Sequence, residues 1–143
     1  MSLVDPTGFL LTTIRDDVAV AALTTKIRAG EPAAGDALGP GKYQRFVVLT
    51  RLGRSRLKHA PIQTVRYVAL CYGQGGNPWQ DAENLAAAVS DAIHNLGHRI
   101  SSGGVSVFGS YDDGGEPPVN DPDTQQPHSD IVIELGALTS LVP

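Results

Sequence analysis

Three side chains in the second half of the chain are of the types that bind metal ions. Asp91, His94 and His98 have the i, i+3, i+7 spacing that would place a carboxylate and two imidazoles on one helix face. Gly97 argues against this arrangement, because glycine commonly ends a helix and His98 would then leave the shared face. Imidazoles are also favoured near helix C-termini without a metal, since the dipole is negative there. We therefore expect no metal site.

The only cysteine, Cys71, lies in the apolar run 65-VRYVALCYG-73, which is typical of a strand. Nothing near it in sequence would lower the pKa of its thiol, so we expect a buried, inert side chain rather than a nucleophile. One cysteine cannot form an internal disulfide, which is consistent with a reducing compartment. The chain also lacks a G-x-S-x-G or Cys–His signature. These features argue against an enzyme.

A glycine-rich segment, 73-GQGGNPW-79, lies between a predicted strand and a predicted helix, where phosphate-binding loops occur. It lacks the Lys-Ser/Thr ending of such loops, and its spacing is not G-x-G-x-x-G. A tight turn into a helix cap at Asn77 explains these glycines better. We expect no cofactor. The alternative to a structural role is a small soluble enzyme or ligand-binding domain that uses this turn with Asp91 and His94.

Positive charge is concentrated in one stretch of an acidic chain. The segment 50-TRLGRSRLKHAP-61 holds four of the 11 Lys and Arg residues, although the formal net charge is -4: Arg51, Arg54, Arg56 and Lys58. Such a group could contact DNA phosphates, a partner protein or another copy of the chain. A sequence pI of about 5.4 and the lack of interleaved aromatic residues argue against sequence-specific nucleic-acid recognition.

A second segment carries the opposite charge. In 111-YDDGGEPPVNDPD-123, five of the 15 acidic residues occur without any Lys or Arg: Asp112, Asp113, Glu116, Asp121 and Asp123. Two solvated loops would account for both segments. Alternatively, the basic and acidic segments of different copies could meet, and a contact between two different patches generates a ring if its rotation closes. Charge complementarity would then supply steering and register more than affinity.

The overall composition suits one domain with a buried core. The chain has 143 residues, of which 41% are hydrophobic and 18% charged, as in globular rather than disordered chains. No apolar run approaches the roughly 20 residues that a membrane span needs, so we expect no membrane partner. The start, 1-MSLVDPTGF-9, has no basic segment followed by an apolar one, and no secretory signal is expected.

Hydrophobic spacing predicts three helical segments. The first is expected to begin at Asp5 and Pro6, and its apolar positions recur at helical spacing: Phe9, Leu10, Ile14 and Val18. A second, short segment follows in 17–27, before a short edge strand and a long loop over 28–42. The third covers 77–99, with Asn77 as its cap and Gly97 as its stop.

Strand patterns occupy the rest of the chain. Branched and aromatic residues in 43–53 and 62–73 predict a long hairpin with the basic stretch at its tip. Both faces of the first strand should be covered, because its central residues are contiguous and apolar: Val47, Val48 and Leu49. A strand pair or bent strand is expected over 100–113, and alternation in 129–138 predicts a half-buried strand. The order predicts an α+β fold, with a mainly antiparallel sheet that carries its helices on one face.

The order of these segments, over nearly the whole chain, resembles that of the tail terminators, a family of small tail-completion proteins of long-tailed bacteriophages. The opening 6-PTGFLLTTIRDDVAVAALTTKI-27 is similar to their N-terminal helix and the D-x-x-V-x-A-L segment after it, here Asp17, Val20, Ala22 and Leu23. A hairpin follows, then a helix whose start resembles 80-QDAENLAAAVSDAI-93. The closing strand follows a Pro-rich D-P-D-T loop, here within 117-PPVNDPDTQQPHSDIVIEL-135. The loop over 28–42 and the long acidic loop depart from the family.

The resemblance implies a structural virion protein. Such proteins form a ring, typically a hexamer, on the last ring of the tail tube, where they stop polymerisation and present the surface that joins the head connector. The implied partners are the chain itself, tail-tube protein, head-connector protein and, non-specifically, DNA in the lumen. The implied location is the head-proximal end of the tail, after assembly in the host cytoplasm. A head-side connector or stopper component is the nearest alternative. Arg54, Arg56 and Lys58 are named from charge alone, since the family gives no residue motif for the contact.

Overall fold

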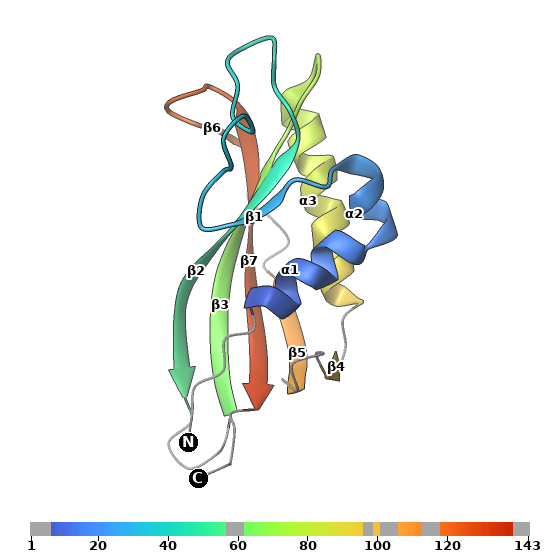
Figure 1. Ribbon diagram of the computed structural model, residues 1–143, viewed down its shortest axis with the longest axis vertical. Helices are drawn as coiled ribbons and strands as arrows, with labels where there is room; N and C mark the ends of the chain where they lie inside the picture. Colours follow the sequence, from blue (N-terminus) through green and yellow to red (C-terminus); the bar gives the residue numbers. More distant parts are fainter. Residues whose placement is uncertain (1–6, 57–61, 96–98, 101–105, 113–117, 139–143) are drawn as a thin grey trace.

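The computed structural model describes residues 7–56, 62–95, 99–100, 106–112 and 118–138 (Figure 1). The helices within these ranges are α1 (Thr7–Asp16), α2 (Val18–Leu23) and α3 (Pro78–His94). The strands are β1 (Ile27–Ala29), β2 (Phe46–Arg56), β3 (Ile62–Tyr72), β4 (Arg99–Ile100), β5 (Ser106–Asp112), β6 (Val119–Asn120) and β7 (Pro127–Leu138). The predicted cap at Asp5 and Pro6, and the predicted stop at Gly97, lie outside the described residues.

All the described strands belong to one sheet, in the order β1-β2-β3-β7-β5-β4. The short strand β6 also pairs with β7, and it lies on the side away from β3 because His128 pairs with both Val119 and Tyr72. Every pair is antiparallel except β1 with β2, which are parallel. The three helices lie on one face of the sheet (Figure 1). The predicted α+β fold is confirmed.

The apolar core lies between the helices and the sheet. It is made by side chains from α1, α2, α3 and the sheet strands, and includes Leu10, Ile14, Leu85, Val89, Ile131, Ile133 and Leu135. The alternation predicted for the last strand is confirmed, since Ile131, Ile133 and Leu135 are all buried. Removing this much apolar surface from water is the main term that stabilises such a fold.

On the opposite face of the sheet, the buried apolar cluster formed by the described residues lies at one end. Phe46, Val48 and Tyr72 form a second, small cluster there, and the rings of Phe46 and Tyr72 stack with their centroids 4.1 Å apart. Val47 and Leu49 point into the main core instead. Both faces of β2 are therefore covered near its start, as the contiguous apolar residues predicted.

The third helix ends earlier than its pattern predicted, whereas α2 (Val18–Leu23) covers the one or two helical turns expected within 17–27. After α2, the Thr24 hydroxyl donates to the Arg45 carbonyl at 3.0 Å and the chain enters β1. α3 ends at His94, and Asn95 is its C-cap. Both N-termini are capped by side chains, as expected for Asx residues: Asp17 accepts from the Val20 amide and Asn77 from the Gln80 amide.

The turn between β3 and α3 brings the backbone of Gly73 against the first turns of the helix. A Cβ at this position would lie 2.1 Å from the Pro78 carbonyl oxygen and 2.5 Å from the Ala82 nitrogen. Gly75 has a φ of 85°, a left-handed conformation that glycine adopts readily. The glycines of 73–77 thus permit a close strand-to-helix approach, as the interpretation of a tight turn required.

We expect Gly73→Ala to lower the free energy of unfolding by about 1–3 kcal/mol, because the added methyl group meets fixed backbone. Urea denaturation would measure the change. Gly76→Ala is the matched control, since a Cβ there meets nothing within 4 Å. Equal losses in the two variants would mean that the close approach at Gly73 does not constrain the fold.

Candidate assembly surface

The basic residues lie on a strand rather than in a loop. β2 continues to Arg56, so Arg51, Arg54 and Arg56 all pair with residues of β3, and Lys58 lies outside the described residues. The hairpin itself is confirmed, but its strands are longer than the apolar pattern indicated. A β-bulge between Arg51 and Gly53 accommodates Leu52, whose side chain is 55% exposed. The bulge lets polar and charged residues extend the strand along the edge of the sheet.

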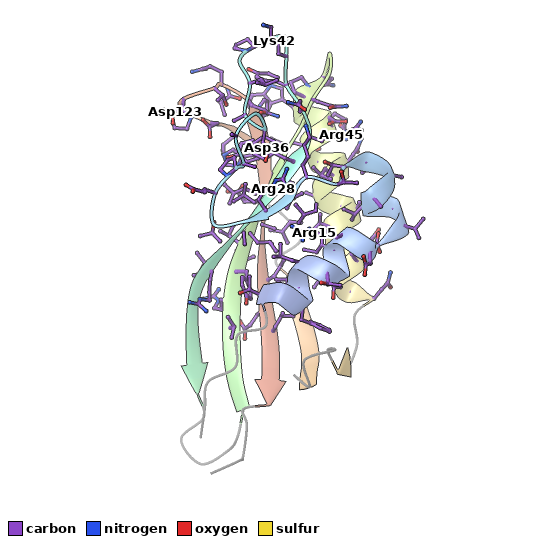
Figure 2. The ribbon with its side chains drawn as sticks, in the orientation of Figure 1. Arg15, Arg28, Asp36, Lys42, Arg45 and Asp123 are labelled. Atoms are coloured by element: carbon purple, nitrogen blue, oxygen red, sulfur yellow. The ribbon has the colours of Figure 1, made fainter. Side chains whose placement is uncertain are left out.

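The acidic residues divide between two places. Asp112 is the last residue of β5, and Asp121 and Asp123 lie in the turn between β6 and β7. Asp113 and Glu116 lie outside the described residues. Figure 2 shows Asp123 at the end of the sheet where β7 begins, whereas β2 runs toward the opposite end. β7 extends along most of this length, and its twelve residues correspond to roughly 36 Å at ~3.3 Å per residue.

The Asp121 side chain forms its hydrogen bonds within its own turn and to the neighbouring strand β3. Its Oδ1 accepts hydrogen bonds from the amides of Asp123 and Thr124, and its Oδ2 accepts one from the Tyr72 hydroxyl at 3.3 Å. Burial acts to raise the pKa of Asp121, but the two amide hydrogen bonds, together with the one from Tyr72 and the charge of His128, lower it by more, so the pKa lies below its usual range. This carboxylate therefore holds the β6–β7 turn together. Of the three described acidic residues of the 111–123 segment, only Asp112 lies on a strand at the β5 side of the sheet.

The long loop between β1 and β2 lies beside this turn. The Tyr43 hydroxyl donates to the Thr124 carbonyl at 3.2 Å, and Gln126 Nε2 donates to the Gln44 carbonyl at 2.6 Å. Within the loop, Asp36 is almost fully buried and pairs with Arg28 at 3.0 Å (Figure 2). The hydrogen bond from Arg28 lowers the pKa of Asp36. The end of the β1–β2 loop and the end of the β6–β7 turn thus contact each other at one end of the sheet.

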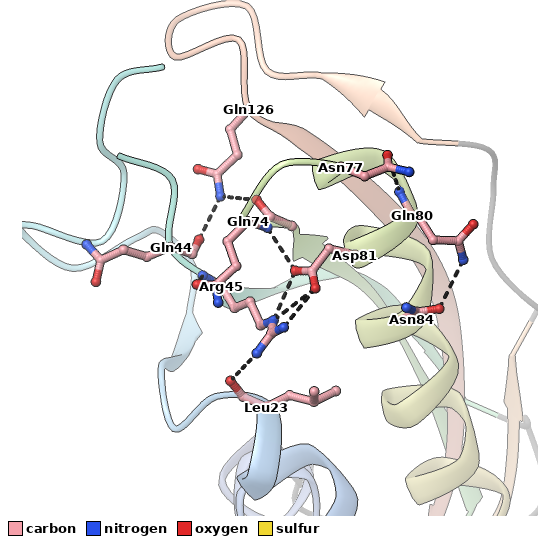
Figure 3. A network of polar contacts seen from close by, with 10 residues as sticks. Leu23, Gln44, Arg45, Gln74, Asn77, Gln80, Asp81, Asn84 and Gln126 are labelled. Atoms are coloured by element: carbon pink, nitrogen blue, oxygen red, sulfur yellow. Dashed lines mark hydrogen bonds and ion pairs between the residues drawn. The ribbon is translucent and has the colours of Figure 1, made fainter. Parts of the chain in front are cut away.

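A network of polar contacts joins this end to the helices (Figure 3). Arg45 forms a two-point ion pair with Asp81, with Nη2–Oδ1 at 2.8 Å and Nε–Oδ2 at 2.9 Å. The Gln74 amide donates to Asp81 Oδ2 at 2.8 Å, and Arg45 Nη1 donates to the Leu23 carbonyl at 3.4 Å. Asp81 of α3 therefore connects the glycine turn with Arg45, the residue before β2, and Arg45 connects in turn to the last residue of α2.

An open depression of about 310 Å³ lies over this network. Its lining is mostly polar: Arg45, Gln74, Gly75, Gly76, Asn77, Gln80, Asp81 and Asn84. Burial acts to raise the pKa of Asp81, but the hydrogen bonds from Arg45 and the Gln74 amide lower it by more. The pKa therefore lies below its usual value, and Asp81 stays charged and paired. A carboxylate held in this way is a poor general base near neutral pH. The depression is best explained as the surface above a structural ion pair.

The residues that an enzyme or ligand-binding domain would have used are not brought together. Asp91 and His94 are exposed on the last turns of α3. The 73–77 turn lies at the other end of this helix, roughly 20 Å away at ~1.5 Å per residue. Cys71 is fully buried, and burial strongly raises the pKa of its thiol. Within the ranges that the structure describes, no group of three or more His, Cys, Asp or Glu side chains could hold a metal ion.

Several features of the surface were not visible in the sequence. The pairing of Arg45 with Asp81 joins residues far apart in the chain, and no local pattern indicates it. Large apolar side chains are exposed at four described positions: Val18, Leu52, Trp79 and Val119. Leu52 is the one that lies on β2, next to the arginines. Among the described helices, none has the length and apolar character of a membrane-spanning segment.

Comparison with known proteins shows a likeness of fold. No protein-family model matches the chain, and no curated protein matches it either. A chain of the virion of a native gene transfer agent (GTA) particle is similar in structure, with a TM-score of 0.67 and 18% sequence identity. The alignment covers 90% of this chain and 91% of the other. At this identity the likeness establishes a shared fold, over nearly the full length of both chains.

We expect Asp81→Asn to destabilise the protein in a pH-dependent way. The folded pKa of Asp81 is lowered, so its stabilising effect is present above the unfolded pKa of about 3.9 and is lost as pH falls through the folded pKa. The variant should lose about 1–3 kcal/mol of unfolding free energy at pH 7, and the difference should shrink below about pH 4.

Urea denaturation at several pH values would test this, with Asp91→Asn as the control because Asp91 is exposed on the same helix. A constant difference between wild type and Asp81→Asn from pH 7 down to pH 3 would contradict the assignment.

Proposed function

We propose that this protein is a structural component of a virion. The observation that carries the proposal is the fold shared with a chain of the gene transfer agent virion, over 90% of this chain and 91% of that one. Agreement over nearly the full length of both chains supports a common architectural role better than agreement over a fragment would. Because one fold can serve unrelated functions, the test below addresses function directly.

Within the virion, the role we propose is that of a tail terminator. The resemblance of the opening helix, the hairpin, the long helix and the closing strand to that family supports it. In this role, copies of the chain form a ring, a hexamer by the family's habit, on the last ring of the tail tube. The ring matches the growing end on one face and offers no equivalent face to another tube subunit, so polymerisation stops.

The partners follow from this position. They are other copies of the chain, the tail-tube protein on one face and the head-connector protein on the other, with non-specific contact to DNA that passes through the lumen. The protein would assemble in the host cytoplasm and remain at the head-proximal end of the tail. The helices cover one face of the sheet, and the described residues form only a small apolar cluster on the other face. This difference supports a ring whose two surfaces differ in chemistry.

We propose that charge contributes to the contact between copies. The basic residues at the end of β2 and the acidic residue at the end of β5 lie on opposite edges of the same sheet. Patches on opposite edges of one copy can meet only between copies, in a heterologous contact that generates a ring if its rotation closes. This contact involves Arg51, Arg54 and Arg56 together with Asp112, whereas Asp121 is committed to its own turn.

Deletion of the gene should leave tails of uncontrolled length without heads, because nothing would cap the tube. Electron microscopy of the particles made by the deletion strain would measure tail length and head attachment. The control is the same strain complemented with the intact gene. Tails of normal length beside unjoined heads would indicate a head-side connector or stopper instead. Intact, infectious particles would overturn a virion role and favour the binding-domain alternative.

Self-association should weaken at high salt, because the Debye length falls from about 10 Å at 0.1 M to about 3 Å at 1 M. Sedimentation velocity would show oligomers at low salt that dissociate at high salt. Arg54→Glu with Arg56→Glu should prevent association even at low salt, whereas Arg54→Lys with Arg56→Lys, which keeps the charge, should retain it. Unchanged association in the Glu variant would rule out the charged contact.

A further inference from the structure

The outer edge of β2 changes character along the strand. Near its start it is covered by β1: the Val47 amide donates to the Lys26 carbonyl at 2.9 Å, and the Leu49 carbonyl accepts from the Gly30 amide at 2.7 Å. Beyond Leu49, β1 ends, and none of the described strands pairs with positions 53–56 on this side. We call these four positions the β2 edge.

The bulge at Leu52 determines which backbone groups the β2 edge presents. In an antiparallel ladder, successive residues direct their N–H and C=O alternately to one neighbour and to the other. Val47 and Leu49 face β1, so Val48 and Thr50 face β3. After the bulge the register continues as Gly53 with Arg66 and Ser55 with Thr64, and these even-numbered β3 residues face β2 throughout. The backbone groups of Arg54 and Arg56 therefore face outward.

The other side of the sheet offers a second edge. The Gly73 amide donates to the Pro127 carbonyl, so odd-numbered residues of β7 face β3 and even-numbered ones face β5. On β5, Ser110 and Asp112 pair with the odd residues Leu135 and Ile133, so their own backbone groups face away from β7. β4 covers β5 only at Ser106 and Val107. We call positions 108–112 the β5 edge.

We propose that the β2 edge of one copy pairs with the β5 edge of the next copy, so that one sheet continues from subunit to subunit. Three antiparallel steps separate β2 from β5, through β3 and β7, so the two strands run in opposite directions. A neighbouring copy in the same orientation can therefore add its β5 to β2 as an antiparallel strand. The inference rests on the proposed ring and specifies the contact that closes it.

Charge selects this partner over the alternatives. Charged residues on an edge strand prevent indiscriminate pairing, and two β2 edges together would bring arginines against arginines. The β5 edge ends in Asp112 instead. Placing Arg54 opposite Asp112 also places Arg56 opposite Ser110, so all four outward-facing positions are used. Opposite charges directly across a strand pair are favourable, and the exposed Leu52 side chain adjoins the contact.

Cross-linking of two differently labelled copies tests the pairing. One copy carries Arg54→Cys and the other Asp112→Cys, and Cys71→Ala in both removes the native thiol. Directly opposed residues in such a pair have Cα atoms about 5.5 Å apart, which suits a disulfide. Under mild oxidation, at concentrations where the wild type forms oligomers, the mixture should give covalent dimers and neither variant alone should. Arg54→Cys mixed with Asp123→Cys is the control, because Asp123 lies in the β6–β7 turn.

Each other outcome overturns the pairing. Dimers of Arg54→Cys alone would indicate contact between two β2 edges. Dimers with Asp123→Cys instead of Asp112→Cys would indicate a contact with the β6–β7 turn. Oligomers without the 54–112 cross-link would leave a ring held by another surface. The terminator role is judged separately, by the tail length of the deletion strain.

A proline variant tests the backbone contribution without cysteines. Arg54→Pro removes an outward N–H, whereas Arg54→Thr removes the same charge and keeps the N–H in a residue that favours strands. We expect the proline variant to weaken self-association roughly tenfold more than the threonine variant, as one or two lost hydrogen bonds would do. Circular dichroism would establish that both are folded. Equal weakening in two folded variants would rule out strand pairing.

Discussion

The antiparallel ladder between β3 and β7 is the constraint on which the rest of the structure depends. It pairs every residue from Ile62 to Tyr72 with a residue of β7, without an interruption. On one face of this ladder, Tyr67, Ile131, Ile133 and other buried side chains pack against the helices. Because the ladder lies in the middle of the sheet, β2 and β5 are placed on its two sides, and the sheet necessarily has two different outer edges.

Much of this arrangement was predictable from local patterns. The stripe of α3, the alternation of β7 and the apolar runs of the hairpin each follow from burial on one face, which repeats at short intervals in the sequence. The parallel pairing of β1 with β2 and the pairing of Arg45 with Asp81 were not predictable. Both join segments that lie apart in the chain, and no periodic pattern in the sequence indicates such a contact. Both contacts depend on the order of the strands in the whole sheet.

The candidate surface was predictable in charge but not in geometry. The clustering of arginines in 50–56 and of carboxylates in 112–123 is plain in the sequence. Their positions depend on two structural features that the composition does not reveal. The bulge at Leu52 sets the direction of the backbone groups after it, and Asp121 is used within its turn rather than at the surface. Charge alone groups Asp112 with Asp121, whereas the fold places Asp112 at the end of β5 and Asp121 in the β6–β7 turn.

A sheet with two unlike edges has a consequence for assembly. An edge that pairs with the same edge of a second copy makes an isologous contact, which stops at two copies. Pairing between unlike edges repeats in one direction and stops only when the rotation closes. In the proposed pairing, opposite charge at Arg54 and Asp112 would make each edge a poor partner for itself and a good one for the other. Closure of the proposed ring would also remove the open edges that would otherwise template aggregation. The same pairing would thus serve assembly and keep the exposed strands from unwanted partners.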